Sequence, residues 1–346
     1  MSGTYFDRVV AETPTRLWIN NPSRRETELA IANHAINCTT NPAYCSKLLQ
    51  SDPEWLRSVI DEVVRYEPDD DVAADLVYQK TAGWVMEQFR PLYEKSKGEY
   101  GYVTIQADPR EDDDVDLIIA AARRHRKLGP NYMAKIPVIR AGIKAMEAVV
   151  AENIPICATE IFSIAQAIHM CEVYEAAASK TGNRPKFFIT HITGIFDELM
   201  ADIVKREKIN VRPEALAQAG CIVGRKEYHL VKERGYDTTI LLGGARGTQH
   251  FTEFVGGDIH CTINWSTAQE LLDMNPPVEN RIDAPAPEDI VQELMEKIPH
   301  FHRAYVDDGI PVEQFKDYGP VVHFRNSFMA GYSRLLEEVA ARRRLL

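Results

Sequence analysis

The sequence predicts an α/β protein, a closed (β/α)8 barrel with extra helices after the second strand and at the C-terminus. Eight short apolar runs recur along the chain, each followed by a longer stretch with helical periodicity. No two consecutive runs are joined by a tight hairpin signal, which favours parallel strands connected by helices. A doubly wound open sheet is the rival fold. It usually carries a glycine-rich loop after its first strand, and residues 20–24 hold no glycine.

The eight apolar runs give the expected strands in chain order. They span 16–20, 35–39, 102–106, 132–136, 155–159, 186–190, 238–242 and 258–262. Segment 42–101 is expected to hold two or three helices, and the chain after Asn264 is expected to be mostly helical. Because no Pro/Gly/Ser-rich linker divides the chain, we expect one domain over 1–346.

Composition excludes several classes of partner. Apolar residues make up 45% of the chain and charged residues 26%, as in globular proteins, and the formal net charge is −11. Nucleic acids and anionic membranes require a basic face, so neither is expected as the main partner. A local cationic pocket stays possible. No run of 18 apolar residues exists to span a membrane.

Cysteine and histidine spacing limits the chemistry further. The six cysteines show no C-x-x-C spacing, and Cys38, Cys157 and Cys261 lie in apolar runs, which indicates a reducing, cytoplasmic compartment. The ten histidines show no H-x-x-x-H spacing. We therefore expect neither a metal nor a cofactor.

Lys135 is the most informative single residue, because it lies inside the apolar run 132–136. Burying a charged amine costs several kcal/mol unless it is paired or deprotonated, so such a lysine usually has a lowered pKa. A neutral amine can attack a carbonyl and form a Schiff base, which acts as an electron sink. The alternative is a structural lysine that reaches solvent or pairs with a carboxylate.

Polar residues at the ends of the other runs strengthen the first interpretation. In a (β/α)8, or TIM, barrel the chemistry lies at the carboxyl ends of the strands. Several polar residues fall at or just past these ends, and their convergence favours a site. They are Asn20, Thr39 to Asn41, Gln106, Lys135, Thr159, Thr190 and Arg246.

Four segments give the chain a resemblance to the transaldolase family of class I aldolases. Thr39-Thr-Asn-Pro42 resembles the family's TTNP segment, and Met133-Ala-Lys-Ile-Pro137 its Schiff-base strand. Phe162-Ser-Ile-Ala-Gln166 resembles the opening of the helix after the fifth strand. The stretch from Leu242-Gly-Gly-Ala-Arg246 to Gly257-Asp-Ile-His-Cys-Thr262 resembles the seventh and eighth strands.

The resemblance implies roles for individual residues. Lys135 is similar to the amine that condenses with a ketose carbonyl, while Thr39 and Asn41 are expected to bind substrate hydroxyls. Thr159 resembles the hydroxyl that holds a water for proton transfer. Thr190 takes a family serine position near the three-carbon unit. Arg246 resembles an arginine that binds the terminal phosphate; its alternative is a surface arginine that caps the following helix.

The chain also departs from the family pattern. Asn20 replaces an aspartate expected to act as a base, and Gln106 replaces a glutamate. Neither amide can accept a proton at neutral pH. The aldolase branch of the family carries glutamine at the second position, so a free aldolase is as plausible as a transferase.

Three further positions bear on the substrate and on the missing base. Ile195 stands where the family usually has a second phosphate-binding arginine, so we expect Arg140 or His191 to contact the anionic or hydroxylated substrate. Glu160 should alternate away from Thr159 into a structural salt bridge. A local irregularity that turned Glu160 inward would make it the substitute base.

The resemblance therefore implies a transaldolase-type transferase of carbohydrate metabolism, of the pentose phosphate kind. It would transfer or release a dihydroxyacetone unit from a sugar phosphate through a Lys135 imine, without a cofactor, and lyase activity stays possible. One alternative is an enzyme that acts on a non-standard sugar. Another is a catalytically impaired barrel that binds sugar phosphates. The donor, the acceptor and a homo-oligomeric state stay open.

Overall fold

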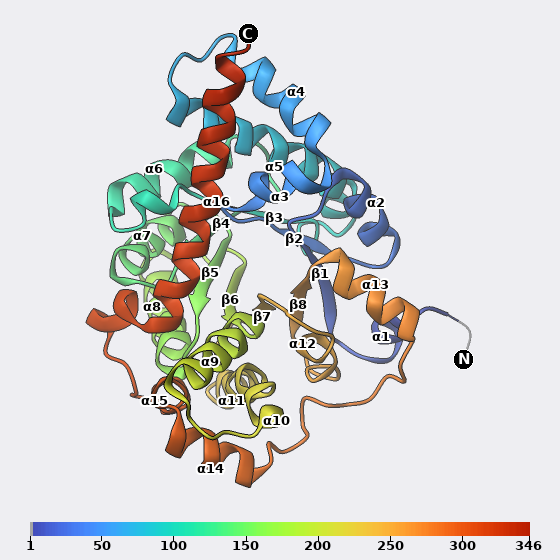
Figure 1. The fold of residues 1–346 in the computed structure, drawn as a ribbon, viewed down its shortest axis with the longest axis vertical. Helices are drawn as coiled ribbons and strands as arrows, with labels where there is room; N and C mark the ends of the chain where they lie inside the picture. Colours follow the sequence, from blue (N-terminus) through green and yellow to red (C-terminus); the bar gives the residue numbers. More distant parts are fainter. Residues whose placement is uncertain (1–2) are drawn as a thin grey trace.

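Eight parallel strands close into a barrel in the computed structural model, which describes residues 3–346 (Figure 1). Neighbouring strands pair in chain order, and β8 closes onto β1. The predicted (β/α)8 class is confirmed, and each predicted strand overlaps an observed one. The strands are β1 (Arg16–Asn20), β2 (Asn37–Thr39), β3 (Val103–Gln106), β4 (Tyr132–Pro137), β5 (Ile156–Ile161), β6 (Phe187–Ile192), β7 (Thr239–Gly243) and β8 (His260–Ile263).

The barrel interior is filled at its amino-terminal end by large side chains that alternate with outward-facing ones. Trp18 lies at the centre of this layer, with its ring 4.9 Å from that of Phe188 and its indole N–H donating to His260 Nδ1 at 2.9 Å. The other members of the cluster are Tyr102, Met133, Cys157 and Leu241. Because the strand period is two residues, the residues two positions further along point into the carboxyl-terminal half. Among them are the polar residues Asn20, Lys135, Thr159 and Thr190.

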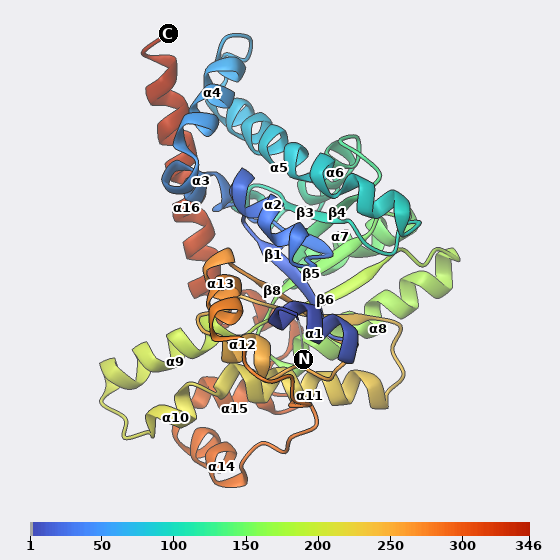
Figure 2. The same cartoon turned by 90° about the vertical axis from the view of Figure 1, so that its right-hand side faces the viewer.

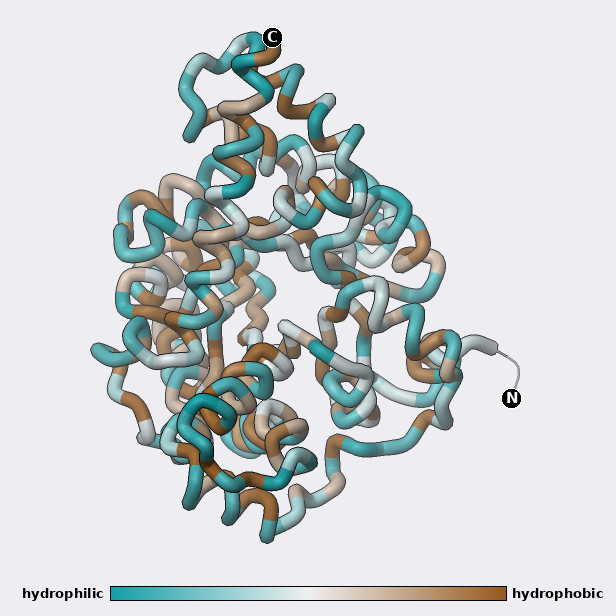
Figure 3. The backbone as a smooth tube through the Cα atoms, in the orientation of Figure 1, coloured by the Kyte–Doolittle hydropathy of each residue, from teal (hydrophilic) through white to brown (hydrophobic). Residues whose placement is uncertain are grey.

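The helices surround the strands, and most bury one apolar face against them. Figure 3 shows hydrophobic and hydrophilic segments alternating along these helices. The helices between β1 and β8 are α2 (Arg24–Ala32), α3 (Tyr44–Ser51), α4 (Pro53–Val64), α5 (Asp70–Lys95), α6 (Val115–Arg126), α7 (Arg140–Ala151), α8 (Ile164–Thr181), α9 (Gly194–Glu207), α10 (Pro213–Leu216), α11 (Ala219–Glu233) and α12 (Gln249–Thr252). Helix α1 (Tyr5–Glu12) precedes the barrel.

The insertion and the tail are helical, as predicted. Helices α3, α4 and α5 follow β2, and the chain after β8 forms α13 (Trp265–Met274), α14 (Glu288–Lys297), α15 (Pro299–Tyr305) and α16 (Gly319–Arg343). Two short 3₁₀ helices, η1 (Pro109–Glu111) and η2 (Val312–Asp317), complete the described chain. Figures 1 and 2 show α16 lying over one end of the barrel, where it contacts α3 and α9. Since these helices follow β2 and β6, α16 covers the carboxyl ends of the strands.

The connection from β4 to α7 is unusually close. A Cβ atom on Gly142 would lie 2.0 Å from the carbonyl oxygen of Pro137, so only glycine allows α7 to pack this tightly against β4. This contact holds the end of the strand that carries Lys135.

All six cysteines are buried free thiols, and Cys38, Cys157 and Cys261 lie in strands. Among residues 3–346, no helix combines the length and apolar content needed to cross a lipid bilayer.

Candidate active site

A pocket of about 320 Å³ opens at the carboxyl ends of the strands, beneath α16. Of the residues predicted to converge there, six line it: Asn20, Thr39, Asn41, Lys135, Thr190 and Arg246. They come from four strands, β1, β2, β4 and β6, and from the loops after β2 and β7. Closure of the barrel therefore brings together side chains that lie far apart in the sequence.

Lys135 projects into this pocket from β4, with only 6% of the residue exposed. Burial lowers its pKa. The acidic groups that oppose this shift, Cys157, Glu160 and Cys38, act on it through space and not by hydrogen bonds. The ammonium nitrogen lies 5.8 Å from the centre of the Phe328 ring on α16. This environment favours the neutral amine, which is the nucleophilic form.

A hydrogen-bonded polar wall from β1, β2 and β8 forms one side of the pocket. The Thr39 hydroxyl donates to Asn20 Oδ1 at 3.0 Å and lies 2.7 Å from the hydroxyl of Thr262. Asn20 Nδ2 donates to Asn264 Oδ1 at 3.0 Å, just beyond β8. Asn41 lines the same wall. Amides and hydroxyls in this arrangement can donate to and accept from the hydroxyl groups of a sugar.

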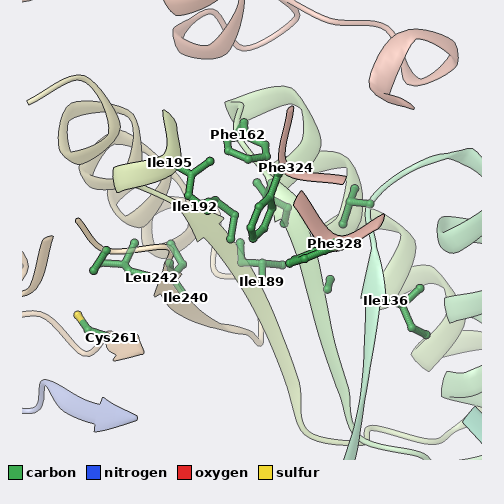
Figure 4. Close-up of a cluster of buried hydrophobic side chains, with 14 of the residues drawn as sticks. Ile136, Phe162, Ile189, Ile192, Ile195, Ile240, Leu242, Cys261, Phe324 and Phe328 are labelled. Carbon is green, nitrogen blue, oxygen red and sulfur yellow. The ribbon is translucent and has the colours of Figure 1, made fainter. Parts of the chain in front are cut away.

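The opposite side is apolar and comes from β6, α9 and α16. The rings of Phe324 and Phe328 pack against one another at 4.2 Å between centres, tilted by 49°. Figure 4 shows Phe324 reaching from α16 toward Ile192 and Phe162, and Phe328 reaching toward Ile189. Ile195, at the start of α9, also lines the pocket and is 6% exposed. Thr190 lies between the two walls, with its hydroxyl 3.0 Å from Cys157 Sγ.

Arg246 reaches the pocket from the loop after β7, but its guanidinium is already paired. Its Nε donates to a carboxylate oxygen of Glu198 on α9 at 2.5 Å. The two side chains are 46% and 44% exposed, so solvent weakens the pair without removing it. The arginine therefore presents less free positive charge to a ligand than the sequence suggests.

A model of the family described as Transaldolase/Fructose-6-phosphate aldolase matches residues 17–317 of this chain. The match spans nearly the whole barrel and every predicted site residue. The chain belongs to this transaldolase family.

Individual relatives agree with the family model. The chain is 26% identical to the transaldolase of Thiobacillus denitrificans, with 91% of this chain and 95% of the relative aligned. It is 24% identical to the transaldolase of Thermobifida fusca, with 68% of this chain and 69% of the relative aligned. The chain is thus an enzyme of the transaldolase type, and the family expected from the sequence is confirmed.

Two predicted site residues of this transaldolase-family chain, Gln106 and Thr159, are fully buried beside the pocket. Gln106 is the strand partner of Lys135, and its Nε2 donates to Glu160 Oε1 at 3.1 Å.

The register of β5 against β6 shifts between Ala158 and Ile161, and Glu160 has a φ of 62°. This bulge turns Glu160 toward Gln106. The expectation of an outward structural salt bridge at Glu160 is therefore wrong.

The structure corrects the expected positions of His191 and Arg140. His191 faces away from the pocket, because residues along a strand alternate and its neighbours Thr190 and Ile192 point inward. Its ring nitrogens lie 2.9 Å from Glu227 Oε1 and 3.0 Å from the carbonyl oxygen of Gly220, both in α11. Arg140 is exposed at the start of α7 and does not line the pocket.

Sequence reasoning missed several pocket residues of this family member. Lys47 of α3 lines the pocket, burial lowers its pKa, and its ammonium donates to Asn264 Oδ1 at 3.3 Å. Asn264 follows the eighth apolar run, so its strand-end position was a usable signal. The α16 residues Phe324 and Phe328 carried only the four-residue spacing of an ordinary buried helix face.

Proposed function

We propose that this enzyme forms a Schiff base between Lys135 and a ketose, and transfers or releases a dihydroxyacetone unit. The observation that carries the proposal is the amine of Lys135, which lines the pocket while burial lowers its pKa. The polar wall of Asn20, Thr39 and Asn264 supports it, because it offers donors and acceptors for the hydroxyls of that unit. Membership of the transaldolase family supports the same reaction class.

The reaction runs through an imine and an enamine. The amine adds to the ketose carbonyl, and loss of water gives an iminium. The bond between the third and fourth carbons then breaks, its electrons flow into the iminium, and an aldehyde leaves as the hydroxyl proton passes to a base. The enamine either adds to a second aldehyde, as in a transaldolase, or is protonated and hydrolysed, as in an aldolase.

Trapping the imine tests this proposal. Incubation with fructose 6-phosphate and borohydride should add to the intact protein the mass of the reduced imine of the ketose, or of the dihydroxyacetone unit left once the aldehyde departs. Peptide mapping should place this adduct on Lys135. Lys135→Met should abolish the adduct. Lys47→Met is the matched control, because Lys47 is a second buried lysine in the same pocket and should leave the adduct in place. An adduct on Lys47, or none with any ketose, would contradict the proposal.

Whether transferase or aldolase activity dominates needs a separate measurement. Gln106 can position a water but cannot itself take its proton, so hydrolysis without an acceptor depends on a second group nearby. We expect release of free dihydroxyacetone to be slower without an acceptor aldehyde than turnover with one. Release at the same rate in both conditions would favour the aldolase.

A second candidate keeps the imine but changes the far end of the substrate. Ile195 lines the pocket where a second arginine is usual in the family, and Arg246 is paired with Glu198. Together with Phe324 and Phe328, these contacts suit a substrate whose distal end carries little or no charge. Comparison of kcat/KM for fructose and fructose 6-phosphate tests this. A strong preference for the phosphate ester would exclude it.

A further inference from the structure

The bulge in β5 places a carboxyl group where the strand pattern alone would not. Three residues of β5 span the register interval that two residues of β6 span, between Ala158 and Ile161. Glu160 takes a left-handed backbone conformation, with φ of 62°, which costs a residue other than glycine of order 1 kcal/mol or more. Such conformations persist only where surrounding contacts impose them, and they concentrate at functional sites.

Gln166 imposes this conformation from the first turn of α8. Its side-chain amide donates to the carbonyl oxygens of Glu160, at 3.0 Å, and Val138, at 3.2 Å. Its carbonyl accepts from the backbone N–H of Phe162 at 3.0 Å. One fully buried side chain therefore ties Glu160 and the backbone just after the bulge to the residue that follows β4. A buried polar residue thus holds the backbone of Glu160 in place.

The Glu160 carboxyl reaches across β4 to Gln106 on β3, beside Lys135. Three buried polar atoms around it have no hydrogen-bond partner within residues 3–346: Glu160 Oε2, Gln106 Oε1 and Thr159 Oγ1. Buried polar groups normally have a hydrogen-bond partner. Those without a partner in the protein commonly bind a water molecule or a ligand. Glu160, Gln106 and Thr159, termed here the proton-transfer cluster, can together bind a water beside the amine.

Two cations and a second buried carboxyl influence the protonation of Glu160. Burial raises the pKa of Glu160 to about 7, against the hydrogen bond from Gln106 and the positive charges of Lys135 and Arg325. Asp112, which follows η1, is also buried, and its pKa is raised by burial and by the charge of Glu160. Arg325 of α16 lies 3.9 Å from Asp112. Because the charge of Glu160 acts on the buried Asp112, the state with both carboxyls ionised is disfavoured, and this pair retains a proton near neutral pH.

We propose that Glu160 supplies and takes back the proton in imine formation at Lys135, through a water held by Gln106 and Thr159. The inference rests on the Schiff-base function proposed above. Protonated Glu160 passes its proton through the water to the carbinolamine hydroxyl. The carbon–oxygen bond breaks, water leaves, and the nitrogen lone pair forms the C=N bond. On hydrolysis the carboxylate takes a proton from the attacking water as the C=N electrons return to nitrogen.

An isosteric pair of variants tests this role. Glu160→Gln keeps a partner for Gln106 but removes the proton donor. The exchange Gln106→Glu/Glu160→Gln moves the carboxyl to the other side of the 3.1 Å hydrogen bond and keeps the composition of the pair. Imine formation is measured in single turnovers by borohydride trapping across pH, and folding by thermal melting.

We expect Glu160→Gln to slow imine formation at neutral pH by at least about 100-fold, within the usual range for a general acid. It should also remove the decline of the rate at alkaline pH. The exchange variant should recover at least about tenfold of the loss. A merely structural role predicts no loss in the isosteric variant and no recovery in the exchange.

Three outcomes would overturn the inference. One is a folded Glu160→Gln protein with the wild-type rate and pH profile, and another is a folded exchange variant as slow as Glu160→Gln. Where Glu160→Gln does not fold, the wild type decides, because its rate must decline above about pH 7, and a rate that keeps rising contradicts the role. Failure of the Schiff-base function is distinct, since the wild type would then trap no adduct at any pH.

Discussion

The ammonium nitrogen of Lys135 lies 5.8 Å from the centre of the Phe328 ring, although the two residues come from the fourth strand and the last helix. The ring is 1% exposed and helps to seal the pocket above the amine. The C-terminal helix therefore contributes to the lowered pKa of this lysine as well as to the shape of the pocket.

Phe328→Leu should raise the pKa of Lys135 toward its ordinary value, because the smaller side chain admits water to the amine. A higher pKa leaves less of the neutral amine at neutral pH, so imine formation there should slow several-fold. The rate at high pH should change little. Val322→Ala, on the exposed side of the same helix, is the control and should leave the profile unchanged.

Lys135→Met should stabilise the protein while it abolishes imine formation. Burial lowers the pKa of Lys135, so folding disfavours its protonated form. This cost is complete below the folded-state pKa and disappears as the pH rises through the unfolded value. We expect the variant to be more stable by roughly 1–3 kcal/mol at neutral pH, less so near pH 10. Urea unfolding at both pH values measures this, and a destabilised variant at neutral pH would be the contrary result.

Glu160→Gln should make stability less dependent on pH. A carboxyl whose pKa is raised to about 7 in the folded state binds its proton more tightly there than in the unfolded chain. Wild-type stability therefore falls as the pH rises from the unfolded pKa through about 7. Relative to wild type, the variant should gain roughly 3 kcal/mol between about pH 5 and pH 8. Glu12→Gln, at an exposed position, should show no such gain.

Glu198→Gln should strengthen binding of substrates that end in phosphate, because it frees the Arg246 guanidinium from its partner. The pair is half exposed, so we expect a decrease in KM of only about 3- to 10-fold, with kcat unchanged. The KM for an unphosphorylated ketose should stay the same. Glu207→Gln, on an exposed part of the same helix, controls for the change in net charge. An equal effect from both variants would mean that Arg246 does not contact the phosphate.

Asn20→Asp should raise turnover of fructose 6-phosphate, because it supplies a base at the end of β1. The aspartate can keep the hydrogen bond from Thr39. Position 20 and Lys47 both contact Asn264, so the new carboxylate would lie near a cation. We expect an increase in kcat of about tenfold or more. Asn264→Asp places the same charge just beyond β8 and should not raise kcat. An unchanged rate in Asn20→Asp would indicate that another base, such as Glu160, already serves this step.

Much of the fold and part of the site were predictable from local pattern. Each apolar run of about five residues became a strand because its length and flanking helical stretches suit a buried parallel sheet. Strand order followed from chain order, since right-handed crossovers place consecutive strands side by side. The polar residues at the strand ends then had to meet at one end of the barrel, which is why Lys135, Asn20 and Thr39 were found together.

Only the tertiary structure decided which charges face one another. Strict alternation along a strand placed Glu160 outward, but Gln166 stabilises a bulge that turns it toward Gln106. The pairing of Arg246 with Glu198 and the position of Phe328 over Lys135 also join segments far apart in the chain. The periodicity of a sequence predicts the direction of a side chain only where the strand is regular. The partner of that side chain, and hence its pKa, depends on how distant elements pack.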